Sequence, residues 1–134
     1  MSAAVAPLAI GLACGGGDDV PQDERARQVS GVAELAANAY AAAGADGLYD
    51  YLSPDVIVNC SKQGLVTALS DQPVPEGFVR SSSVNFDGDR ARAKIVQRVQ
   101  DGAGTKEVEV EWTFASIGGS WRLTHVPGLE RCTG

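Results

Sequence analysis

Histidine and cysteine are the side chains best suited to act as nucleophiles, bases or metal ligands near neutral pH, and this sequence has few of them. They are His125, Cys14, Cys60 and Cys132. A zinc site needs several such ligands at a defined spacing, and these four are scattered, so we predict no metal site. Cys60 as a nucleophile would have only His125 as a base. A lone histidine is more often a core or rim residue with a satisfied ring nitrogen than a catalytic group.

The first cysteine, Cys14, follows an apolar segment over residues 3–13 and precedes a Gly/Asp-rich stretch over residues 15–19. An apolar stretch, a small residue, a cysteine and a flexible polar tether in this order resemble a bacterial lipoprotein signal. The resemblance implies export and lipid modification of Cys14. Residues 1–19 would then be signal and tether, and residues 20–134 the domain. The alternative is an Ala-rich terminus with no such role.

Cys60 and Cys132 remain once Cys14 has a role, and an even number is what an exported protein with one disulfide would have. A bond between Cys60 and Cys132 would close about 70 residues and stabilise the fold by roughly 4 kcal/mol on the chain-entropy model. Two free thiols are the alternative.

Length and composition suit one folded domain. The chain has 134 residues, of which 44% are apolar and 21% are charged, so we expect one core rather than disorder. A net charge of −6 argues against nucleic-acid binding. No apolar run reaches the roughly 20 residues of a membrane span. The triple glycine at residues 15–17 lacks the strand and lysine of a phosphate loop, and we predict no cofactor.

The first half of the domain has helical patterns. Asp19 can cap a helix that has Pro21 in its first turn and ends near Gly44. Its apolar stripe is Val29, Val32, Ala33, Ala36 and Tyr40. Shorter helices are predicted over residues 45–52, after the cap Ser53-Pro54, and after the cap Ser61, where the apolar side is Leu65, Val66 and Leu69.

The second half alternates as strands do. We predict strands over residues 78–86, 90–99 and 106–114, and a last one from Ser120 to Val126, separated by Gly-rich turns. The inward side chains of the third strand are Val108, Val110, Trp112 and Phe114, with Glu107, Glu109 and Glu111 outside. In the last strand, Trp121, Leu123 and His125 share one face.

The alternations along residues 90–99 and 106–114 also predict how these two strands pair. Pairing Arg98 with Glu107 and Lys94 with Glu111 puts both apolar rows on the same face, whereas a slip of one residue would invert one strand. The outer face then carries a basic row beside an acidic row, which we interpret as a solvated ladder of charges.

This order of elements is α+β: a long N-terminal helix and short helices packed on a curved four-stranded antiparallel sheet. The long helix, the segment Leu48-Tyr49-Asp50-Tyr51-Leu52-Ser53-Pro54, the Asp87-Gly88-Asp89 hairpin and Gly119-Ser120-Trp121 resemble the nuclear transport factor 2-like, or cystatin-like, cone fold. Residues 52–69 also resemble small bacterial lipoproteins of that superfamily with no assigned reaction. The resemblance implies a cavity between sheet and helices, but no reaction.

Enzymes of this fold use buried carboxyls and a tyrosine hydroxyl, since an apolar cavity raises the pKa of a carboxyl. The resemblance implies as candidates Tyr40, Tyr49, Tyr51, Asp46 and Asp50. The inward faces of the second and third strands offer no Asp or Glu, which argues against acid–base catalysis. We therefore expect no catalytic residue. The expected cavity-lining residues are Tyr40, Tyr51, Ile95, Gln97, Trp112, Trp121 and His125.

The sequence thus favours an exported binding or interaction domain without catalysis, which a lipid anchors to the membrane surface outside the cytoplasm. Its partner would be a small apolar ligand or a protein, and the membrane would be contacted only through the anchor. One alternative is an isomerase- or dehydratase-like enzyme that uses Tyr and Asp residues. Another is a structural module that forms a homodimer through its open sheet face.

Overall fold

The structure is a computed structural model that describes residues 21–132. The expected signal and tether, with Cys14, lie outside the described residues. The helical part comprises α2 (Gln22–Ala43), α3 (Ala45–Tyr49), α4 (Pro54–Asn59) and α5 (Lys62–Ala68). The strands β2 (Pro75–Asp87), β3 (Arg90–Asp101), β4 (Gly104–Ile117) and β5 (Ser120–His125) follow, and the short 3-10 helix η3 (Leu129–Arg131) comes last. The α+β class is confirmed.

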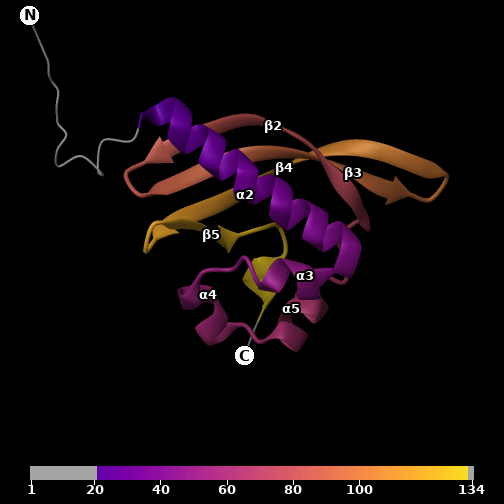
Figure 1. The fold of residues 1–134 in the computed structure, drawn as a ribbon. Helices are drawn as coiled ribbons and strands as arrows, with labels where there is room; N and C mark the ends of the chain where they lie inside the picture. Colours follow the sequence, from indigo (N-terminus) through magenta and orange to yellow (C-terminus); the bar gives the residue numbers. More distant parts are fainter. Residues whose placement is uncertain (1–20, 133–134) are drawn as a thin grey trace, which may run out of the picture.

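The strands form one antiparallel sheet in the order β2-β3-β4-β5. The helix α2 lies diagonally across one face of the sheet, and α3, α4 and α5 gather beside β5 (Figure 1). The turn at Asp87-Gly88-Asp89 is confirmed, and Gly88 has φ 65°, a left-handed conformation that glycine adopts without strain. The sheet therefore builds up from hairpins between neighbouring strands, as the turn signals predict.

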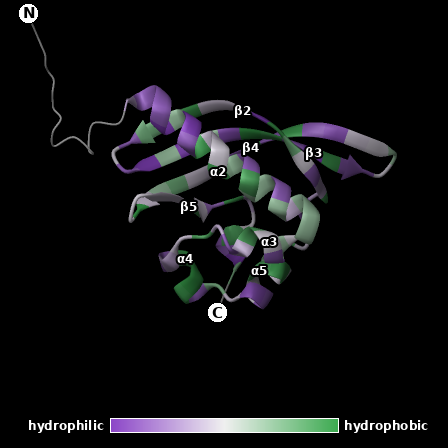
Figure 2. Cartoon of the chain, viewed as in Figure 1, coloured by the Kyte–Doolittle hydropathy of each residue, from purple (hydrophilic) through white to green (hydrophobic). Residues whose placement is uncertain are grey.

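The predicted register between β3 and β4 is confirmed. Arg98 pairs with Glu107 and Lys94 with Glu111, without a shift along the ladder. Trp112 and Phe114 are buried, Val108 and Val110 are half-buried, and Glu107, Glu109 and Glu111 are exposed. Hydrophilic and hydrophobic residues intermix along these strands (Figure 2), as expected for a sheet with one covered face.

The edge strand β2 follows a less regular path. Its register with β3 shifts between Pro75 and Gly77, between Phe78 and Arg80, and between Ser81 and Ser83. Each shift leaves one extra residue on β2, which is a β-bulge, and bulges bend a strand and increase its twist. The bulges thus give the sheet the curvature that lets it wrap around α2.

The core lies between α2 and the covered face of the sheet. On the helix the buried residues are Val29, Ala33, Ala36 and Ala37. Against them lie Ala93, Ile95, Trp112, Phe114 and Leu123, each at most 1% exposed. Small side chains let the helix approach the sheet closely. They also let α3 approach α2, since a Cβ on Gly47 would overlap the backbone carbonyl of Ala39.

The helix ends differ from the prediction in detail. The first helix begins at Gln22, and Pro21 stands just before it rather than inside its first turn. Ser53 occupies the predicted cap position, but its hydroxyl makes no capping bond, whereas Ser61 accepts a hydrogen bond from the Gly64 N–H at 2.9 Å. Val66, expected on the apolar side of α5, is 37% exposed.

The last strand, β5, differs from the predicted alternation in a way that affects the site. Phe114 pairs with Leu123, but Thr113 pairs with His125, so Thr124 is an extra residue on β5. This bulge reverses the alternation beyond Leu123. His125 therefore turns to the exposed side, while Val126 turns inward and is 2% exposed. The expectation that His125 shares the buried face of Trp121 and Leu123 was wrong for this reason.

The C-terminal segment is attached by a disulfide between Cys60 and Cys132, whose Cα atoms lie 5.4 Å apart. The predicted pairing is confirmed. A disulfide indicates an oxidising compartment outside the cytoplasm. None of the described helices is both long and apolar enough to span a bilayer.

Candidate functional site

A cavity of ≈ 240 Å³ lies between the C-terminal half of α2 and the end of the β3–β4 hairpin. Its strand walls are the apolar side chains Val99, Val108, Val110 and Trp112. Two connecting segments close it: Gln72 and Pro73 after α5, and Val126 and Pro127 after β5. Tyr40 and Gln97 complete the lining.

The polar groups of this cavity are uncharged. Its lining contains one tyrosine and two glutamines, and none of the described residues that line it carries a carboxylate, an imidazole, an ammonium or a guanidinium. Burial raises the pKa of the Tyr40 hydroxyl above its ordinary value of 10.0. The hydroxyl therefore stays protonated at physiological pH and can donate as well as accept a hydrogen bond.

Gln97 is the most unusual of these polar residues. It lies on the inner face of β3, is 5% exposed, and its Oε1 is buried without a hydrogen-bond partner among residues 21–132. A buried acceptor without a partner costs about 1–3 kcal/mol. A rotation of the terminal amide exchanges its oxygen and nitrogen, so Gln97 can offer either an acceptor or a donor next to the cavity.

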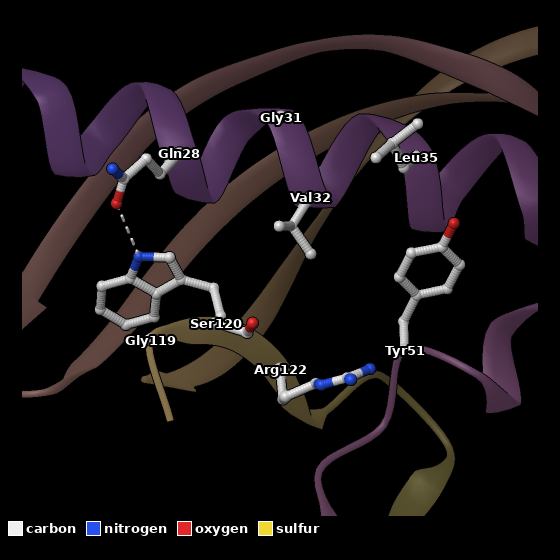
Figure 3. A pocket seen from close by; sticks show the side chains of 9 residues that line it. Gln28, Gly31, Val32, Leu35, Tyr51, Gly119, Ser120 and Arg122 are labelled. Atoms are coloured by element: carbon white, nitrogen blue, oxygen red, sulfur yellow. Dashed lines mark hydrogen bonds between the residues drawn. The ribbon is translucent and has the colours of Figure 1, made fainter. Parts of the chain in front are cut away.

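A second hollow, which we call the groove, lies between α2 and β5 and measures ≈ 460 Å³. Val32 and Leu35 border it from the helix, and Ser120 and Arg122 border it from the strand (Figure 3). At one end the Trp121 Nε1 donates to Gln28 Oε1 at 3.4 Å, and Tyr51 stands at the other end (Figure 3). Leu35 is 59% exposed. The groove is thus an open surface feature, unlike the cavity, whose strand walls are buried or half-buried.

The residues expected to line a single cavity lie at several separate places in the structure. Tyr40, Gln97 and Trp112 line the cavity, whereas Tyr51 and Trp121 line the groove. Ile95 is fully buried in the core. His125 lies in a shallow hollow beside the disulfide, with its Nε2 3.7 Å from Glu130 Oε1.

The carboxyls considered for an enzyme of this fold lie elsewhere. Asp46 and Asp50 are exposed, and neither lines the cavity. Tyr49 is half-buried, with the Lys62 Nζ 5.6 Å from the centre of its ring. Neither Asp46 nor Asp50 therefore meets Tyr40 at the cavity, as an acid–base pair would require.

Sequence reasoning missed the part of the cavity that comes from connecting segments. Gln72, Pro73 and Pro127 are in loops, whose direction has no periodic signal, and Val126 faces inward only because of the bulge at Thr124. Gln97, by contrast, was identifiable as the one polar residue on the inward row of β3.

No family model matches the chain, and no curated protein matches it. Among solved structures it is similar to a designed NTF2-like protein, titled Rd1NTF2_05 with substitutions, at 17% identity and a TM-score of 0.48. The match covers 79% of this chain and 97% of the designed one.

Proposed function

We propose that this domain binds a small, uncharged and largely apolar ligand in the cavity between α2 and the β3–β4 hairpin. The observation that carries the proposal is the composition of the walls: apolar side chains with three uncharged polar residues, Tyr40, Gln72 and Gln97. Entry of an ion would remove its hydration shell without offering an opposite charge, which is strongly unfavourable. An apolar molecule with one hydroxyl or amide group has no such cost.

The size of the cavity narrows the ligand class. An apolar cavity of about 150 Å³ accepts benzene, and the space here is ≈ 240 Å³. A single substituted ring, or an aliphatic molecule of similar volume, therefore fits. The unpartnered Gln97 Oε1 and the protonated Tyr40 hydroxyl favour a ligand with one hydrogen-bonding group.

Three related probes test this proposal: p-cresol, its methyl ether 4-methylanisole, and the anion p-toluate. Titrations followed by the NMR signal of the Trp112 indole should show saturable binding of p-cresol, weaker binding of 4-methylanisole and none of p-toluate. The substitution Val110→Phe fills the cavity and should abolish binding. Val58→Phe is the matched control, because Val58 is 78% exposed on α4 and does not line the cavity.

The proposal would be contradicted if p-toluate bound as well as p-cresol, or if Val110→Phe left p-cresol binding unchanged. It would also be contradicted if neither uncharged probe bound up to millimolar concentration.

We also propose that the domain is held at the outer surface of a membrane through a lipid on Cys14. The sequence around Cys14 supports this, and the Cys60–Cys132 disulfide is consistent with an exported domain. Two or more acyl chains on one residue anchor a protein without a spanning helix. Mass spectrometry of membrane-bound protein should find a diacylglyceryl-modified Cys14 as the first residue. Mature protein that retains residues 1–13 and fractionates without membrane would contradict the anchor.

A further inference from the structure

Two walls of the cavity come from segments that are not part of the sheet or of α2. We call residues 69–73 the α5 loop and residues 126–132 the C-terminal strap. The α5 loop contributes Gln72 and Pro73 to the cavity, and the strap contributes Val126 and Pro127. The width of the cavity therefore depends on the contacts between the α5 loop and the C-terminal strap.

Arg131 makes that connection. From the strap, its Nε and Nη2 donate to the backbone carbonyl of Ala68 at 3.3 and 3.0 Å, just before the α5 loop. Its Nη2 also pairs with Asp71 Oδ1 at 2.5 Å, within the loop and next to Gln72. One guanidinium therefore contacts both the last residue of α5 and the loop that follows it, using the planar fork that arginine alone offers.

The strap is folded so that Arg131 can reach the loop. Gly128 has φ 96°, and a Cβ there would lie 3.0 Å from both Arg131 Nη2 and Leu69 Cδ2. Glycine thus serves both the left-handed turn and the close passage of the strap over the loop. The Arg131 N–H, in turn, donates to the Gly128 carbonyl at 3.0 Å.

Other contacts fasten the strap to the body of the domain. Cys132 is bonded to Cys60, and Leu129 is 7% exposed in the core. The Arg131 side chain is 47% exposed and that of Asp71 is 64% exposed, and exposed ion pairs contribute little to stability. Arg131 is therefore poorly placed to hold the fold together, but well placed to set the distance between the strap and the α5 loop.

We infer that Arg131 is a positioning residue of the cavity: it holds the α5 loop against the C-terminal strap and so keeps the two loop walls at ligand-binding distance. This inference rests on the proposed binding function. Without Arg131 the disulfide keeps the strap on the domain, but Gln72 and Pro73 can move away from Val126 and Pro127. A bound ligand then loses contacts on one side and leaves faster.

The test compares Arg131→Gln with Arg122→Gln. Arg122 is a matched control, because its Nη1 also donates to a backbone carbonyl, that of Asp50, at 2.9 Å, but it borders the groove instead. We expect Arg131→Gln to weaken p-cresol binding on the order of tenfold, mainly through faster dissociation, a typical size for coupling through a neighbouring segment. Arg122→Gln should change the affinity for p-cresol less than about twofold, which is below the usual size of such coupling, because Arg122 does not contact the cavity.

Two further variants separate positioning from a general loss of structure. Asp71→Asn removes one of the two contacts of Arg131 and should weaken p-cresol binding less than Arg131→Gln does. The double variant should bind p-cresol no worse than Arg131→Gln alone. Arg131→Lys keeps the charge and should restore part of the affinity. Thermal unfolding should change little in all of them.

A readout without ligand keeps this inference separate from the proposed function. The Gln72 N–H donates to the Leu69 carbonyl at 3.1 Å in the α5 loop, and its hydrogen exchange should accelerate in Arg131→Gln but not in Arg122→Gln. If p-cresol fails to bind the wild type while this exchange behaves as expected, the proposed function fails and the connection between loop and strap stands. If binding and exchange are both unchanged in Arg131→Gln, the positioning role is wrong.

Discussion

Arg98 of β3 lies directly opposite Glu107 of β4, yet Glu107 forms its ion pair with Arg80 of β2, at 3.6 Å. A second contact also joins β2 to β4 across β3: Ser82 Oγ donates to Glu109 Oε2 at 2.6 Å. In the register Val96 stands between Arg80 and Glu109. Although Val96 is on the outer face, it is only 5% exposed. The stems of long polar side chains thus shield an apolar residue on an otherwise solvated face.

The ion pair between Arg80 and Glu107 should contribute little to stability, because both side chains are about half exposed. A double-mutant cycle with Arg80→Ala and Glu107→Ala, measured by urea unfolding, should give a coupling of about 0.2–1 kcal/mol. The same cycle with Arg98→Ala in place of Arg80→Ala should give a smaller value. A larger coupling for Arg98 would mean that the directly opposite pair dominates in solution.

The disulfide should be a major source of stability, because it joins residues 72 positions apart. Replacing both Cys60 and Cys132 by Ala should lower the free energy of unfolding by about 4 kcal/mol on the chain-entropy model. Reduction of the wild type by dithiothreitol should have a similar effect, measured by guanidinium unfolding. The double variant is the control, since the reductant should leave it unchanged; a loss in both proteins would point to another cause.

Replacing Gln97 by Met should raise the stability of the protein and weaken its selectivity among ligands. The variant removes the buried oxygen that lacks a partner while keeping the length of the side chain, so the free energy of unfolding should rise by about 1 kcal/mol. The preference for p-cresol over 4-methylanisole should shrink at the same time. Calorimetry of unfolding and of binding measures both effects. A clear loss of stability would show that the amide is satisfied in solution.

Ionisation of the buried Tyr40 hydroxyl should lower the stability of the protein at high pH. Burial raises the pKa of its hydroxyl in the folded state above 10.0, so the folded protein holds this proton when the unfolded chain has begun to lose it. The contribution of Tyr40 to stability is therefore constant below pH 10 and is lost as the pH rises through the folded-state pKa. Unfolding free energies from pH 8 to 11, a window set around that ordinary pKa, should fall less steeply for Tyr40→Phe than for the wild type. Parallel curves would contradict the raised pKa.

The sequence by itself determined the features that rest on local patterns. The alternation along β3 and β4 and the Gly-rich turns determined the strands and their register, because a slip of one residue would place a charged row in the core. The stripe through Val29, Ala33 and Ala36 determined which face of α2 is buried. The disulfide was predicted from the number of cysteines and the expected export, with two free thiols as the alternative, and the structure contains the bond.

Only the tertiary structure decided where the cavity lies and what lines it. A bulge depends on how a strand fits its neighbours, so the extra residue at Thr124, which moves His125 out and Val126 in, has no local signal. The loop walls at Pro73 and Pro127 meet because distant segments pack together, and Arg131 reaches Ala68 across 63 residues of sequence. Periodicity describes which way a side chain points within one element. It cannot describe how two irregular segments enclose a space, because their approach is determined by packing and turn geometry rather than by a repeat.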